Sequence, residues 1–248
     1  MVDSMQVYKE IPQITNQARA RPAELVGIVS VAEEWTVARH KESAEEVIDS
    51  LPFEAPFVLD AGTGMYLNAL VLDVPLAPKV PREVRAEAEE LAAGAENPRR
   101  EARRLELEIS GVAERGSIWG EDPRYDAAFV YLRPARDVLD RNIRLRSSKI
   151  VRGGGAEEAR KLEESGVEPN PSVREAIGVR EMLLHASGKL SDEEAEEIIA
   201  TRTRRLARRQ IRWFDKLARG LPDTGRSLVV ESAEDEKIKH FIHVTMEA

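Results

Sequence analysis

Short apolar runs alternate with longer amphipathic stretches along the chain, and this alternation predicts an α/β fold. The runs at 24–30, 56–59 and 126–132 show little polar alternation, which is typical of strands buried on both faces of a parallel sheet. A last strand is expected at 226–230. Strand and helix patterns follow one another through the first half and helices dominate the second, which indicates a parallel sheet with a helical half.

The helical pattern recurs at eight places, and some of them carry end signals. Thr36 is an expected N-cap, and Ser191 with Glu194 forms an expected capping box. The glycine run at 153–155 is expected to break the helical pattern as a hinge. The predicted helices are 36–50, 65–71, 81–93, 97–109, 134–151, 156–164, 172–186 and 191–219, with a short acidic helix after the last strand.

Composition narrows the class of protein. The 248 residues are 42% hydrophobic and 33% charged, with a mean hydropathy of −0.41. This is enough apolar material for a core, so global disorder is excluded. No apolar run reaches the ~20 residues of a membrane helix, and no export signal is visible, so we expect a cytoplasmic protein. The chain has no cysteine, which excludes disulfides, thiol catalysis and cysteine-based zinc sites.

Charge is distributed unevenly. The net charge of −8 and the 5% aromatic content argue against a surface that is generally coated by nucleic acid or stacks many bases. The stretch 201–219 nevertheless holds eight basic residues against one acid, and on a helix Arg205, Arg209 and Arg212 share a face. Such a face suits a pyrophosphate or an RNA backbone. The alternative is a solvated basic face neutralised by the acidic turn at 192–197.

Two short segments carry candidate chemistry. Asp3 would lie at the ligand edge of a parallel sheet, where a carboxylate can accept a proton from an amine or hydroxyl. The Gly62-Thr63-Gly64 turn permits close backbone approach and adds a hydroxyl before a helix N-terminus. The alternatives are a solvated N-terminal Asp and an ordinary tight turn. The histidines lack a third ligand at metal spacing, so no metal site is predicted, and no G-x-x-x-x-G-K-[ST] phosphate loop occurs.

Four motifs, in this order, resemble those of the bacterial tRNA dimethylallyltransferases, also known as tRNA isopentenyltransferases. The similarity is nearly unbroken from 125 to 217, and it weakens between 74 and 124 and after 220. The motifs are DSMQVY at 3–8, AGTGMYL at 61–67, SVREAIGVRE at 172–181 and TRRLARRQIRW at 203–213.

The resemblance implies a P-loop-NTPase-like parallel sheet with flanking helices, here without the family's first strand and P-loop. The α/β core with its C-terminal helices would comprise 1–75 and 125–248, and a shortened helical insert would comprise 76–124. The family is nucleotide-binding, and the ATP-binding class is implied with it.

The resemblance also implies an activity: transfer of a dimethylallyl group from its pyrophosphate to the exocyclic amine of the adenosine 3′ of the tRNA anticodon. Asp3 would be the general base, Thr63 would hydrogen-bond near the acceptor, and Mg²⁺ would accompany the pyrophosphate. Arg174 and Arg209 would hold the pyrophosphate. The implied tRNA contacts are Asp3, Ser4, Met5, Gln6, Arg100, Arg103, Arg174 and Arg180. The expected partners are tRNA and dimethylallyl pyrophosphate, with no membrane and no protein partner.

This sequence departs from the family pattern in several places. It starts two residues before the first motif, the insert is shorter, and Gln17 stands where the family has a lysine. Three alternatives follow: a reading frame that begins too late, a paralogue that binds RNA without chemistry, and an enzyme that prenylates a free adenine nucleotide. Whether this chain is itself an active prenyltransferase stays open at this point.

Overall fold

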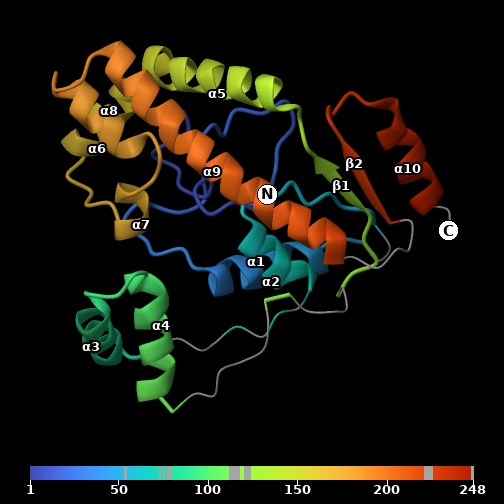
Figure 1. Ribbon diagram of the computed structural model, residues 1–248, viewed down its shortest axis with the longest axis horizontal. Coiled ribbons are helices and arrows are strands. Elements are labelled where there is room, and N and C mark those ends of the chain that lie inside the picture. The colour runs from blue at the N-terminus through green and yellow to red at the C-terminus, as the bar shows by residue number, and fades with distance from the viewer. Residues whose placement is uncertain are drawn as a thin grey trace.

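Helices make up most of the computed structural model, and a small parallel sheet lies at one side of it, beside the last helix (Figure 1). The structure describes residues 1–52, 55–72, 74, 76, 80–111, 118–119, 124–220 and 226–246, without the side chains of Arg99 and Met246. The helices are α1 (Val37–Asp49), α2 (Gly64–Val71), α3 (Arg82–Ala92), α4 (Pro98–Ile109), α5 (Arg136–Ile150), a π-helical turn η1 (Val151–Gly155), α6 (Ala156–Glu164), α7 (Pro171–Arg174), α8 (Val179–Ala186), α9 (Asp192–Gly220) and α10 (Glu236–Met246).

The strands β1 (Phe129–Leu132) and β2 (Ser227–Val230) pair in parallel, with Phe129 opposite Ser227. These two confirm the strands predicted at 126–132 and 226–230. The strands predicted at 24–30 and 56–59 are wrong as continuous elements. The region 24–30 contributes one parallel bridge, Tyr8 with Val29, and the other bridge, Val2 with Ala61, lies just after the region 56–59. In the described residues, each of these pairings extends over a single position.

Most of the helix predictions are confirmed, and so are two of the caps. The Thr36 side chain accepts a hydrogen bond from the backbone N–H of Arg39. Ser191 N–H donates to Glu194 at 2.8 Å while Glu194 N–H donates to the Ser191 hydroxyl at 3.2 Å, which is the reciprocal pattern of a capping box. Helical hydrogen bonding runs from α5 through η1 into α6, with Gly153 and Gly154 outside the helical conformation. The glycine run therefore kinks the helix.

The single helix predicted at 172–186 is wrong, because Gly178 divides it into α7 and α8. Gly178 has φ +99°, and a Cβ there would lie 2.8 Å from the Cγ2 of Ile14. Only glycine fits this conformation and this contact. The break lets the N-terminal segment pack closely against the start of α8.

The core lies under the N-terminal segment. The largest fully buried side chains include Tyr8, Ile11, Ile14, Leu70, Met182 and Ile199. Residues from 2 to 35 therefore form the centre of the packing although they hold no regular element. The N-terminal residues are thus fixed in place by their burial, which matters for a site that begins at Asp3.

Helices α3 and α4 pack on each other around a second, small core of Ala88, Ala92 and Ala102. Figure 1 shows this pair set apart from the remaining helices. An ion pair from Arg85 to Glu34, at 3.0 Å, joins it to the main body. The division into a core of 1–75 and 125–248 and an insert of 76–124 stays a prediction, and 77–79, 112–117 and 120–123 of that insert lie outside the described residues.

Candidate functional site

The first residues of the chain meet the glycine turn at 62–64. Val2 N–H donates to the carbonyl of Asp60 at 2.8 Å, and the N–H groups of Gly62 and Thr63 donate back to the carbonyl of Val2 at 3.1 and 3.2 Å. Ser4 N–H then donates to the Thr63 hydroxyl at 3.1 Å. Segments that are 59 residues apart in sequence are therefore joined by main-chain bonds. Residues 3–6 and 62–64 together are called the Asp3 corner below.

Local hydrogen bonds fix the Asp3 carboxylate. Its Oδ1 accepts the N–H groups of Met5 at 2.8 Å and Gln6 at 3.1 Å. Its Oδ2 points at Gly62, where an added Cβ would lie 2.6 Å away. One oxygen therefore orients the side chain, and the other makes no hydrogen bond within the described residues. Gly62 is needed because any larger residue would collide with that second oxygen.

Helix α9 closes the corner from the other side. The Gln210 side chain donates to the carbonyl of Gly62 at 2.7 Å. The indole of Trp213 lies directly on Gly64 and donates to Asn68 Oδ1 at 3.3 Å. Trp213 also packs against Trp119, with ring centroids 4.8 Å apart. These contacts hold the Gly62-Thr63-Gly64 turn between the N-terminal segment and α9.

A cation that the sequence analysis did not single out reaches the corner from Arg19. It donates to the side-chain carbonyl of Gln6 and lies 3.7 Å from Asp60. Gln17, which replaces the lysine of the family pattern, instead donates to the carbonyl of Tyr8 at 2.7 Å. The charge missing at 17 is thus supplied two residues later. No periodicity or motif in the sequence marks Arg19 for this role.

Arg146 of α5 is a second residue that the sequence analysis missed. Its side chain is exposed, and no hydrogen bond or ion pair holds it in the part of the chain that the structure describes. Burial nevertheless lowers the pKa of its guanidinium, while the negative charge of Asp3 raises it. This combination is typical of a side chain that stands between elements and faces water on one side. Arg146 therefore offers a free cation to a ligand near Asp3.

The structure brings only some of the predicted site residues together. Asp3, Ser4, Met5, Gln6 and Thr63 meet at the Asp3 corner. Arg174 was expected beside them, but the described contacts place its guanidinium on Glu168 and on the carbonyl of Pro169, at 2.8 Å for the latter. Those contacts do not join Arg174 to Asp3 or Thr63, because α7 is a single turn that ends with this arginine facing its own loop.

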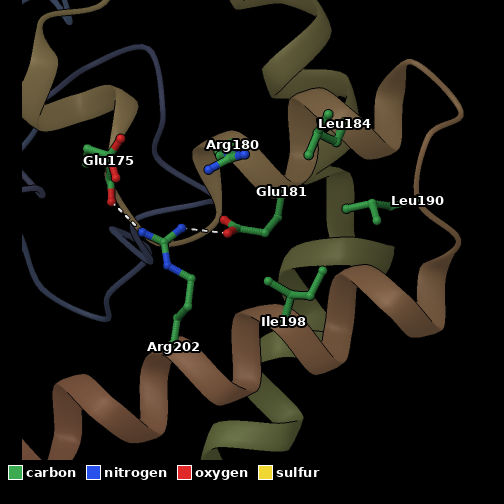
Figure 2. Close-up of a pocket in the computed structure, with 7 residues that line it drawn as sticks. All are labelled: Glu175, Arg180, Glu181, Leu184, Leu190, Ile198 and Arg202. Carbon is green, nitrogen blue, oxygen red and sulfur yellow. Dashed lines mark hydrogen bonds and ion pairs between the residues drawn. The ribbon is translucent and has the colours of Figure 1, made fainter.

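The remaining predicted arginines lie on three helices. Arg100 is exposed on α4, and Arg103 pairs with Glu106 of the same helix. Arg209 is exposed on α9, next to Gln210. Arg180 borders a cavity of about 390 Å³ between α8 and α9 (Figure 2). The cavity is lined by Glu175, Arg180, Glu181, Leu184, Leu190, Ile198 and Arg202.

The polar groups of that cavity are largely satisfied within the protein. Figure 2 shows Arg202 reaching from α9 to Glu181 and to the carbonyl of Glu175. The second oxygen of Glu181 accepts the N–H of Gly178 at 2.8 Å. Arg180 is the exception, because none of the described contacts uses its guanidinium.

Two further findings concern what the described residues hold. They contain no group of three or more His, Cys, Asp or Glu side chains that could bind a metal ion. They also contain no helix that is long and apolar enough to cross a membrane. The described residues therefore offer no cluster of side chains that would hold a resident metal ion.

The sequence is similar to those of known proteins. The family described as IPP transferase matches residues 6–108 and 92–217. A tRNA dimethylallyltransferase of Rubrobacter xylanophilus is 60% identical over 246 residues, which cover 98% of this chain and 84% of that protein. A tRNA dimethylallyltransferase of Phenylobacterium zucineum is 32% identical over 254 residues, covering 89% of this chain and 81% of the relative.

The fold is also similar to those of solved structures. The full-length tRNA isopentenylpyrophosphate transferase of Bacillus halodurans matches 99% of this chain and 86% of its own, with a TM-score of 0.69 at 27% identity. The tRNA delta(2)-isopentenylpyrophosphate transferase of Staphylococcus epidermidis matches 99% of this chain and 88% of its own, with a TM-score of 0.67 at 20% identity, which supports the α/β fold alone. The chain belongs to the IPP transferase family.

Proposed function

We propose that the protein transfers a dimethylallyl group from dimethylallyl pyrophosphate to the exocyclic amine of the adenosine 3′ of the anticodon in tRNA. The observation that carries this is the Asp3 corner, where one oxygen of the Asp3 carboxylate is held by two backbone N–H groups, the other has no hydrogen bond among the described residues, and the Thr63 hydroxyl is bound to the neighbouring Ser4 N–H. It occurs in a chain that is 60% identical to a tRNA dimethylallyltransferase. The reaction belongs in the cytoplasm, where tRNA is found.

The chemistry needs one proton acceptor. The adenosine must leave the base stack to reach a site of this kind. Its amine nitrogen forms a bond to C1 of the dimethylallyl group as the bond from C1 to the pyrophosphate oxygen breaks. The amine proton passes to the free Oδ2 of Asp3, and the pyrophosphate carries away the electron pair. Thr63 hydrogen-bonds near the acceptor, and the Ser4 N–H fixes its hydroxyl.

The leaving pyrophosphate needs cations, and two of the arginines without a partner among the described residues are candidates. Arg146 is exposed near Asp3, and Arg209 is exposed on α9 beside Gln210. Guanidinium groups suit phosphate oxygens because they donate in pairs. Arg174 also remains a candidate, provided that it exchanges Glu168 for the ligand. Mg²⁺ would arrive with the pyrophosphate and neutralise part of its charge, since magnesium bound to phosphates needs only one or two carboxylates.

The tRNA is expected to contact the Asp3 corner and the arginines of the α3–α4 pair. Residues 3–6 would border the extruded adenosine. Arg100 of α4 presents an exposed guanidinium, which suits the phosphates that position a nucleic acid without reading its sequence. Arg103 would act beside it, and Arg180 from the start of α8.

The test is a transfer assay on the chain as given. Labelled dimethylallyl pyrophosphate and Mg²⁺ are mixed with an unmodified tRNA, and label on the tRNA is counted. We expect the tRNA to become labelled. We expect no label when the adenosine 3′ of the anticodon is replaced by guanosine. Label on free AMP instead of tRNA would identify a nucleotide prenyltransferase. Tight tRNA binding without label would identify an RNA-binding protein, and either result would contradict the proposal.

A further inference from the structure

Arg19 joins the Asp3 corner to the segment that follows it in the chain. Its guanidinium nitrogens have different partners. Nε donates to the carbonyl of Gln17 at 3.2 Å, one terminal nitrogen donates to the sulfur of Met1 at 3.5 Å, and the other donates to the side-chain oxygen of Gln6. The proposed function does not use this arginine, although it contacts a residue that would border the adenosine.

The backbone that positions Arg19 is itself anchored. The side-chain N–H2 group of Gln17 donates to the carbonyl of Tyr8 at 2.7 Å and to the Thr15 hydroxyl at 2.9 Å, and Tyr8 is fully buried. The Gln17 carbonyl that receives Arg19 is therefore held against the core. The ion pair with Asp60 adds little, because the two charged atoms are 3.7 Å apart and the Asp60 side chain is 71% exposed.

The contact with Arg19 determines which way the Gln6 amide faces. A guanidinium group has only N–H donors and no acceptor, so the oxygen of an amide must face it. The N–H2 group of Gln6 is on the other branch of the same carbon, and it makes no hydrogen bond among the described residues. The backbone N–H of Gln6 donates to Asp3 Oδ1 at 3.1 Å. The residue bonded to the proposed base thus has an unused donor and an oxygen that is already taken.

These groups match the Watson–Crick edge of adenine, which is the edge by which extruded bases are read. On that edge, adenine presents its N6 amine as a donor and N1 as an acceptor. The Asp3 carboxylate would accept from N6, and the Gln6 amide would donate to N1. Hypoxanthine, the base of inosine, has the reverse pattern, since O6 accepts and N1–H donates. An amide that could turn over would offer its oxygen to that N1–H.

We propose that Arg19 is a specificity-determining residue, which locks the Gln6 amide so that it donates to N1 of the extruded adenine. The inference rests on the proposed function for the identity of the base. Arg19 acts through Gln6 and is a positioning residue, because none of its described contacts reaches Asp3 or Thr63. A purine that carries a proton on N1 meets a donor instead of an acceptor, so a polar group on each side is left unpaired.

The experiment measures the choice between adenosine and inosine in binding. Two anticodon stem-loop RNAs carry either nucleoside 3′ of the anticodon, and their dissociation constants are measured by fluorescence anisotropy. The wild-type protein should bind the adenosine RNA more tightly. Arg19→Met should reduce the ratio of the two constants by about tenfold, because one hydrogen bond is at stake. A general loosening of the corner would weaken the binding of both RNAs alike and leave their ratio unchanged.

A second variant tests the same step without changing Arg19. Gln6→Glu replaces the donating N–H2 group by an oxygen, so it should reduce the ratio at least as far as Arg19→Met. Arg141→Met on α5 is the matched control. Arg141 also lies 3.7 Å from an exposed aspartate, Asp137, and its loss should leave the wild-type ratio unchanged.

The outcomes separate this inference from the proposed function. An unchanged ratio in Arg19→Met or in Gln6→Glu overturns the inference, and so does a wild-type protein that binds both RNAs equally. If the wild-type chain transfers label to tRNA while Arg19→Met keeps the wild-type ratio, the inference fails and the proposed function stands. If the ratio falls in both variants but the wild-type chain transfers no label, the inference is supported and the proposed function is contradicted.

Discussion

Single side chains in this protein are fixed by one local contact and left free for another. Asp3 shows this best, since its Oδ1 is occupied by two backbone N–H groups while Oδ2 faces Gly62. Such an arrangement holds a carboxylate in place without consuming its basic oxygen. The Asp3 side chain is thus positioned although the residues around it form no regular element.

His40 gives the clearest pH dependence at this scale. It is fully buried beside Trp35, whose indole N–H donates to its Nδ1 at 3.1 Å, and its Nε2 has no partner among the described residues. Burial lowers its pKa to about 4 from 6.5. Between these values the unfolded chain binds the proton and the folded chain does not, so stability is complete above about pH 6.5 and falls as the pH falls toward 4.

We therefore expect the wild-type protein to lose about 3 kcal/mol more unfolding free energy between pH 7 and pH 4 than His40→Gln. The glutamine keeps an acceptor for Trp35 and cannot titrate. Urea unfolding at both pH values measures the difference. Equal losses in the two proteins would show that His40 is not the group that senses pH.

At the scale of elements, the contact of α2 with α9 sets the geometry of the site. Gly64 begins α2, and Trp213 of α9 lies so close that no Cβ fits between them. The same contact keeps Gln210 on the carbonyl of Gly62. The packing of two helices thus fixes the turn that presents Thr63.

Gly64→Ala should separate these helices. We expect a loss of about 1–3 kcal/mol of stability, typical of overpacking, with a lower rate of dimethylallyl transfer. Gly94→Ala is the matched control, because a Cβ there meets nothing within 4 Å. Thermal unfolding and the transfer assay compare the two variants. If both behave alike, Trp213 does not constrain the turn.

The elements also show what a sequence can predict. Helices with strong period and caps, such as α1 and α9, were predicted because local hydrogen bonding decides their ends. The strands expected at 24–30 and 56–59 failed, because pairing depends on neighbours elsewhere in the chain; Val58 is 89% exposed. The break at Gly178 was not predicted for a similar reason, since Ile14, which packs against Gly178, lies 164 residues away in the sequence.

At the scale of the whole molecule, the site arises from segments that are distant in sequence. Motif order and the resemblance identified Asp3, Thr63 and the α9 arginines, and the structure joins the first two through Ser4. Arg19 and Arg146 were missed because an arginine outside a motif has no local signature; only the fold places it near a carboxylate. Arg174 was predicted at the corner, and its pairing with Glu168 could not be read from spacing.

The distribution of charge is also a property of the whole molecule. Three acids at the start of α9, Asp192, Glu193 and Glu196, share Arg152, and Glu197 pairs with Arg204. Arg205, Arg209 and Arg212 of the same helix are exposed and lie outside these ion pairs. The positive charge of this acidic protein is therefore concentrated locally rather than spread over a uniformly basic surface.

The most direct test of the account is therefore the rate of dimethylallyl transfer to tRNA by Asp3→Asn. Asparagine keeps the oxygen that accepts the N–H groups of Met5 and Gln6, so the corner retains its shape while the base is lost. We expect a rate at least about 100-fold lower, with tRNA binding unchanged and with Asp60→Asn, an exposed neighbouring carboxylate, close to the wild-type rate. Full activity in Asp3→Asn would contradict the account.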